Sequence, residues 1–147
     1  MNLDKITFRK MKPDEYEVLI NLWDAAGLHY KPNGRDKKEN LLSELNNTQE
    51  SFIFAEYRDG IIGSILVSHD GRKGWINRLV VHPQFRKKGV AAKLIEKAEN
   101  FLAENKIEIF ACLIEDWNQI SMDLFQKAGY QRFDDIIYFT KKLHSEV

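Results

Sequence analysis

The sequence predicts an α+β domain of three layers, in which a mixed, mostly antiparallel and twisted sheet of about seven strands lies between helices. Two observations support this fold class. Segments with the apolar periodicity of strands and of helices follow one another in the order β-α-α-β-β-β-α-β-α-β-β. Residues 75–114 have the pattern strand, helix, strand, which is typical of a right-handed crossover between parallel strands. The 147 residues, 44% of them hydrophobic, suit a single domain over residues 1–147.

The crossover begins with a strand over residues 75–81, WINRLVV, which is rich in large and β-branched apolar side chains. Pro83 ends it, because proline cannot donate a hydrogen bond to a sheet. A helix is expected over residues 90–105, where apolar residues recur on one face. These residues are Ala91, Leu94, Ile95, Ala98, Phe101 and Leu102. Residues 106–114 are almost continuously apolar, which is typical of a strand buried on both faces.

Turn and capping residues mark the remaining elements. Pro13 suits the first turn of a helix, whereas Gly27 and Gly129 suit the position after a helix. Asp59-Gly60 separates two strand-like segments and predicts a hairpin. The expected helices cover residues 14–26, 36–46 and 118–128, and the expected strands cover residues 5–11, 51–57, 61–68, 130–133 and 136–143. The last two strands alternate apolar and polar residues, so we expect them to close the sheet as a final hairpin.

The junction between the strand at 75–81 and the following helix favours an anion. A helix N-terminus leaves up to four backbone N–H groups unpaired and carries about half a positive charge. Gly89 lets a phosphate approach the main chain, and Arg86, Lys87 and Lys88 add positive charge beside it. The phosphate-loop pattern G-x-x-x-x-G-K-[ST] and the dinucleotide pattern G-x-G-x-x-G are both absent. From these residues alone, a phosphate site and a basic loop that only caps the helix remain equal alternatives.

Two motifs in this chain resemble those of the GNAT (Gcn5-related N-acetyltransferase) superfamily. Arg86–Ala91, RKKGVA, matches the R/Q-x-x-G-x-G/A signature, and the preceding residues 79–85 are similar to the run that leads into it. Residues 118–130, NQISMDLFQKAGY, resemble the second acetyl-CoA segment of the superfamily. The two motifs occur in the right order with the right elements between them, and the similarity covers essentially the whole chain. The resemblance implies the acyl-CoA N-acyltransferase fold and acetyl-CoA-dependent transfer of an acetyl group to a primary amine.

The resemblance also implies which residues bind acetyl-CoA, the cosubstrate. The backbone of Leu79 and Val81 would pair with the pantetheine arm, and an N–H near Val80 or Val81 would polarise the thioester carbonyl. Residues 86–91 would wrap the diphosphate, mostly through main-chain N–H groups. The expected cofactor-binding residues are Leu79, Val80, Val81, Arg86, Lys87, Lys88, Gly89, Val90, Ala91, Asn118 and Phe125. The expected acceptor-binding residues are His29, Tyr30 and Asn77.

The chain departs from the superfamily pattern at two positions that bear on catalysis. Many members have a glutamate where this chain has Asn77, and many have a tyrosine where it has Phe125. Asparagine cannot take a proton and phenylalanine cannot donate one. Glu115 and Tyr138 are therefore our candidates for a catalytic acid or base, with Glu56 and Asp116 as further alternatives. The same departures keep open a second function, that of a non-catalytic acyl-CoA-binding module.

Composition limits the other classes of function. Lys plus Arg and Asp plus Glu both number 22, so the basic excess of a nucleic-acid-binding protein is missing. The lone Cys112 excludes an internal disulfide framework, and the four histidines show no metal-ligand spacing. The chain has no apolar run of about 18 residues and no apolar signal core at its start. We therefore expect a cytoplasmic protein without a metal, with a small-molecule amine or peptide acceptor and with a monomer and a homodimer both open.

Overall fold

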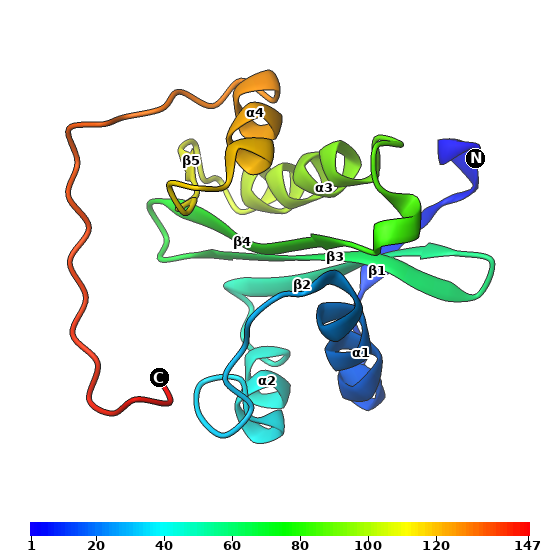
Figure 1. Ribbon diagram of the computed structural model, residues 1–147, viewed down its shortest axis with the longest axis horizontal. Helices are drawn as coiled ribbons and strands as arrows, with labels where there is room; N and C mark the ends of the chain where they lie inside the picture. The colour runs from blue at the N-terminus through cyan, green and yellow to red at the C-terminus, as the bar shows by residue number, and fades with distance from the viewer.

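The computed structural model describes residues 1–147 and contains a five-stranded sheet in the order β1-β2-β3-β4-β5. The strands are β1 (Thr7–Lys10), β2 (Glu50–Tyr57), β3 (Gly60–His69), β4 (Gly74–Val81) and β5 (Phe110–Ala111). β1 to β4 pair antiparallel, and β5 pairs parallel with β4. The helices are α1 (Tyr16–Ala26), α2 (Lys38–Glu44), α3 (Val90–Glu104) and α4 (Gln119–Lys127). Helices α1 and α2 cover one face of the sheet and α3 and α4 the other (Figure 1), so the expected three layers are confirmed.

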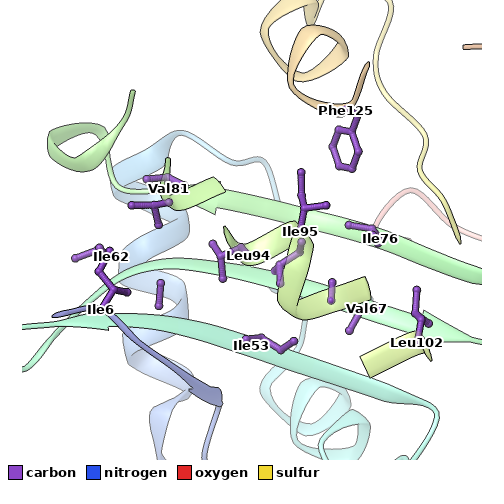
Figure 2. Packing of buried hydrophobic residues seen from close by; sticks show 14 of the residues in the cluster. Ile6, Ile53, Ile62, Val67, Ile76, Val81, Leu94, Ile95, Leu102 and Phe125 are labelled. Atoms are coloured by element: carbon purple, nitrogen blue, oxygen red, sulfur yellow. The ribbon is translucent and has the colours of Figure 1, made fainter. Parts of the chain in front are cut away.

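The sheet is buried on both faces because its strands alternate between two cores. Along β2, Ile53 and Ala55 belong to the core under α3, whereas Phe52 and Phe54 belong to the core under α1 and α2. Helix α3 contributes its apolar stripe to the first core (Figure 2); the stripe consists of Val90, Leu94, Ile95, Ala98 and Leu102. The second core surrounds Trp23, which is fully buried. Two cores of this kind fix the sheet between its helix layers.

The predicted crossover is present. The chain leaves β4, passes through a short 3₁₀ turn at Pro83–Phe85, follows α3 across the sheet and returns to β5. The hairpin predicted at Asp59-Gly60 joins β2 to β3. None of the helices combines the length and the apolar character that crossing a bilayer requires.

The prediction of about seven strands is wrong, because the structure has five. Residues 130–133 and 136–143 form no strand; they lie in an extended segment that runs away from α4 and returns at its end to the loop between α1 and α2 (Figure 1). The apolar side chains of this segment are exposed: Phe133, Ile136, Ile137, Tyr138, Phe139 and Leu143. Alternating apolar and polar residues form a strand only where the edge of a neighbouring strand can accept their backbone hydrogen bonds. The nearest edge would be that of β5, which spans only Phe110–Ala111 and is too short to pair with them. The strand predicted over residues 106–114 is correspondingly reduced to those two residues.

Candidate active site

The parallel pair β4 and β5 is joined at one end only. Gly74 pairs with Phe110 and Trp75 with Ala111, and the ladder stops there. From Ile76 to Val81 the edge of β4 that faces β5 has no strand beside it. The two strands therefore diverge toward the N-terminus of α3 and leave free backbone groups along β4.

A bulge in β4 lies within this divergent part. On the other edge of the strand, Leu66 of β3 pairs with Asn77 and Ser64 pairs with Val80. Arg78 and Leu79 together therefore stand opposite Ile65, as in a β-bulge. Arg78 adopts a φ of 53°, which is uncommon for a residue with a side chain. A bulge re-aims the side chains and the backbone groups around it, and here it does so midway along the free edge.

The N-terminus of α3 is open to solvent. Residues 86–89 are exposed, and Lys87 and Gly89 both have a left-handed backbone, with φ of 62° and 88°. The N–H groups of residues 86–89 donate to no atom of the protein, and those of residues 90–92 have no helical carbonyl to reach. Neither Lys87 nor Lys88 forms an ion pair. We call residues 86–92 the cradle; its donors and charges suit an anion.

The basic residues of the cradle are not equivalent. The Nε of Arg86 donates to the carbonyl oxygen of Val81 at 3.1 Å, and its Nη2 donates to the carbonyl of Ala26 at 3.3 Å. Arg86 thus braces the end of β4 against the end of α1, which leaves Lys87 and Lys88 as the free cations. Leu3 lies over Gly89, and a Cβ at that glycine would come within 3.2 Å of the leucine side chain.

The other predicted cosubstrate residues fall into two groups. Val80, Val81 and Phe125 have buried side chains, so only the backbone of the two valines is available to a ligand. The ring of Phe125 packs edge-on against Tyr130, with centroids 5.1 Å apart. Asn118 caps α4, and its Oδ1 accepts a hydrogen bond from the N–H of Ser121 at 3.1 Å. Its side-chain amide nitrogen remains available.

The structure does not bring the two predicted catalytic residues together. Glu115 is exposed in the loop between β5 and α4. Tyr138 is 67% exposed in the extended segment after α4. Neither side chain makes an ion pair or a hydrogen bond, so nothing in the structure orients either of them.

The predicted acceptor residues lie on the face of α1 and α2. Tyr30 packs against Trp23 with ring centroids 5.5 Å apart, and its hydroxyl donates to Oδ1 of Asp24 at 2.9 Å. His29 has an exposed side chain, and its carbonyl oxygen accepts a hydrogen bond from Arg78. Asn77, also exposed, is the residue before Arg78 on β4. The structure thus places the loop that carries His29 and Tyr30 beside the bulged strand.

Two carboxylates on this face were not predicted from the sequence. Glu44 ends α2 and Glu50 begins β2, and each has a buried Oε2 without a hydrogen-bond partner. Burial, followed by the charge of Glu50, raises the pKa of Glu44 to about 7. Burial also raises the pKa of Glu50. Asp36 and Arg78 act on Glu44 as well, so these four residues form one electrostatic group, which we call the acidic face.

A carboxyl group with a pKa near 7 can both accept and release a proton at neutral pH. No sequence signal reveals it, because Glu44 and Glu50 occupy ordinary polar positions at the ends of separate elements. An open surface depression of about 770 Å³ lies at the start of α2. It is lined by Tyr16, Pro32, Asn33, Lys37, Lys38, Glu39 and Asn40, which include none of the predicted site residues. The depression is shallow and its lining is mostly polar, whereas a substrate pocket is usually concave and mostly apolar.

Cys112 also lies near the gap between the strands, just after β5. It is half-buried, and burial raises the pKa of its thiol to about 11. At neutral pH it is therefore a thiol and not the thiolate that a covalent acyl-cysteine route requires.

Comparison with known proteins identifies the family. The sequence profile of the Acetyltransferase (GNAT) family matches residues 14–130. Acetyltransferase SG1711 of Sodalis glossinidius is 27% identical over 135 residues, which cover 92% of this chain and 94% of that protein.

Solved structures share the fold. An aminoglycoside acetyltransferase from an uncultured soil metagenomic sample, in complex with sisomicin, gives a TM-score of 0.79 at 16% identity. The match covers 96% of this chain and 98% of that one. A predicted acetyltransferase from Clostridium acetobutylicum, with acetyl-CoA, gives a TM-score of 0.74 at 20% identity, covering 92% and 96%. At these identities the likeness is one of fold, whereas the profile covers most of the sequence. The chain therefore belongs to the acetyltransferase (GNAT) family of enzymes, as its two motifs predict.

Proposed function

We propose that this enzyme transfers an acetyl group from acetyl-CoA to the primary amine of a small cationic molecule, by direct attack of the amine on the thioester. The observation that carries the proposal is the row of free N–H groups in the cradle, placed at the end of the open edge of β4. The aminoglycoside acetyltransferase that shares the fold was solved with sisomicin, an amine. The acidic face offers such an acceptor the carboxyl groups of Glu44 and Glu50, which have oxygens without a hydrogen-bond partner, whereas Asp36 is already paired with Arg78.

The residues of the cradle fit the diphosphate of coenzyme A. Diphosphate oxygens accept hydrogen bonds, and the cradle offers donors together with the positive end of α3 and two free lysines. The open backbone of β4 from Leu79 to Val81 would hold the amide groups of the pantetheine arm in the manner of an added strand. The side chains of Val80 and Val81 are turned into the two cores and do not cover this edge, although the carbonyl oxygen of Val81 accepts a hydrogen bond from Arg86.

Acetyl-CoA supplies an activated acyl group, and the chain supplies placement and charge stabilisation. As the amine nitrogen attacks, a C–N bond forms, the carbonyl oxygen becomes negative and the C–S bond then breaks. A backbone N–H of the bulged strand aimed at that oxygen would stabilise it by roughly 3 kcal/mol. The departing thiolate has a pKa of about 8.5, so water can protonate it and the missing hydroxyl at Phe125 is tolerated.

The amine must lose a proton to react. An aliphatic amine has a pKa near 10.4, so its neutral form costs about 4–5 kcal/mol at pH 7. Glu44 is the carboxyl group best suited to take this proton, directly or through water, because burial raises its pKa to about 7. Glu115 and Tyr138 stay as weaker candidates, since the structure orients neither of them.

Calorimetry with acetyl-CoA, followed by thiol-release assays, tests the proposal. The acceptor panel contains sisomicin, spermidine, free amino acids and a lysine-containing peptide. We expect acetyl-CoA to bind and a cationic amine to raise thiol release well above the rate without acceptor. If acetyl-CoA does not bind, the cradle is misassigned. If it binds but no amine raises thiol release, the alternative of a non-catalytic acyl-CoA-binding module is correct.

A further inference from the structure

We infer that Arg78 is a positioning residue, which ties the loop between α1 and α2 to the bulge of β4 and so fixes the acceptor side of the site relative to the thioester side. The inference rests on the proposed function, because it takes this loop as part of the acceptor site. It concerns a residue that neither motif contains.

The contacts of Arg78 reach both ends of the loop. Its Nη2 donates to both carboxylate oxygens of Asp36, at 3.0 and 3.2 Å, and its Nη1 donates to the carbonyl oxygen of His29 at 3.0 Å. Asp36 in turn accepts a hydrogen bond from the N–H of Lys31 at 2.7 Å. The guanidinium also lies over the ring of Trp23, 5.1 Å from its centroid. One side chain therefore fixes the loop to the strand and to α1.

This connection is sheltered from solvent. The Asp36 side chain is only 7% exposed and that of Arg78 16%. A charge-assisted contact between one guanidinium nitrogen and both carboxylate oxygens is weakly screened in such a place. Lysine could offer the charge but not the fork that serves Asp36 and His29 together.

The strand end of the connection is equally specific. Arg78 holds a left-handed backbone within the bulge, a conformation that persists where surrounding contacts impose it. Its neighbours in sequence are Asn77, an expected acceptor residue, and Leu79, whose backbone is expected to hold the cosubstrate. The loop fastened by Arg78 carries His29 and Tyr30. Arg78 thus fixes the position of the acceptor loop relative to the bulge, whereas it makes no contact with the cradle.

The test uses a variant designed to fold. In Arg78→Met with Asp36→Asn, both charges are removed together, the methionine replaces most of the arginine stem, and the asparagine Oδ1 can still accept from Lys31. Replacing both members of a buried pair avoids leaving one charge stranded. The matched control is Arg9→Met with Glu15→Gln, which removes another sheltered ion pair, 2.7 Å long, between β1 and the turn before α1. Arg9 also pairs with Glu56 at 3.3 Å, and the Glu56 side chain is 31% exposed, so water can replace that contact.

Three readouts separate positioning from mere stability. We expect hydrogen exchange of residues 28–37 to quicken by on the order of tenfold or more in the Arg78/Asp36 variant, with residues 86–92 unchanged. Affinity for acetyl-CoA should stay within about twofold, because the cradle is not touched. With sisomicin or spermidine as the acceptor probe, kcat/KM should fall by on the order of tenfold or more through the acceptor KM. Arg78→Lys should give loop exchange rates and acceptor KM values between those of the wild type and the double variant. The Arg9/Glu15 control should leave all three readouts at their wild-type values.

The inference is overturned if loop exchange and acceptor KM match the wild type, or if affinity for acetyl-CoA falls in parallel with acceptor turnover. Failure of the proposed function looks different, because the wild type itself would then bind no acetyl-CoA or use no amine. Loop exchange still decides the role of Arg78 in that case.

Discussion

The cradle and the acidic face are built in opposite ways. The cradle is made of consecutive residues that act through backbone N–H groups and are exposed to solvent. The acidic face draws side chains from the α1–α2 loop, α2, β2 and β4; Asp36 is buried, and Glu44, Glu50 and Arg78 are partly buried. The first depends on a backbone conformation that favours glycine at position 89, whereas the second depends on the identity of each side chain. The difference teaches that a shared motif can fix the cosubstrate while leaving the acceptor to the individual protein.

The largest effect should come from a substitution that breaks the conformation of the cradle. Gly89→Asp puts a side chain at a φ of 88°, within 3.2 Å of Leu3, and brings negative charge among donors meant for phosphate. We expect affinity for acetyl-CoA, measured by calorimetry, to fall on the order of 100-fold or more. Gly71→Asp is the matched control, because Gly71 has a φ of 89° but no atom near its would-be Cβ. Equal losses in the two variants would mean that backbone strain, and not the cradle, is responsible.

The second-largest effect should come from replacing a carboxyl group of the acidic face by an amide of the same shape. Glu44→Gln keeps the shape of the residue but cannot take a proton, so kcat should fall by about 10²-fold with little change in acetyl-CoA affinity. In the wild type, kcat should rise with pH through about 7, where Glu44 loses its proton, and this limb should vanish in the variant. Glu39→Gln on the exposed side of α2 serves as the control. A full rate and an unchanged pH profile in Glu44→Gln would remove Glu44 from the reaction.

A smaller effect should appear in stability. The folded-state pKa of Glu44 lies above the ordinary value of 4.5, so between the two the folded state binds more protons than the unfolded state. Its contribution to the free energy of unfolding is therefore full below about pH 4.5 and is lost as pH rises through about 7. Burial of Glu50 acts in the same direction. Urea unfolding measured at pH 5 and at pH 8 gives the loss of unfolding free energy between the two pH values. We expect this loss to be smaller for Glu44→Gln than for the wild type; equal losses would contradict the burial of this carboxyl group.

The smallest effect is expected at Cys112. Because burial raises the pKa of its thiol to about 11, it should carry no acetyl group, and Cys112→Ala should keep kcat within about twofold. Mass spectrometry of the wild type with acetyl-CoA should find no acetylated cysteine. An acetyl-cysteine that forms and decays at the rate of turnover would replace direct attack with a two-step route.

The sequence predicts what depends on neighbours in the chain. The crossover, the hairpin between β2 and β3 and the cradle follow from periodicity, turn residues and the helix start at Gly89, which are local properties. Residues 136–143 show the limit of this reasoning, since their alternation needs a partner edge that β5 does not extend far enough to provide.

The candidate site divides in the same way. Arg78 and Asp36 are 42 residues apart, and only the fold brings them together. Glu44 and Glu50 are close in sequence, but burial raises their pKa values. This burial cannot be predicted from the sequence, because each residue is a polar residue at the end of a helix or strand. Glu115 and Tyr138 are candidates by residue type alone, and the structure leaves both exposed.

A crystal structure of the protein with acetyl-CoA tests the central claim most directly. We predict diphosphate oxygens within hydrogen-bond distance of the N–H groups of residues 86–92, and the pantetheine arm along the free edge of β4. An acetyl-CoA molecule bound elsewhere, with the cradle facing only solvent, would contradict the account.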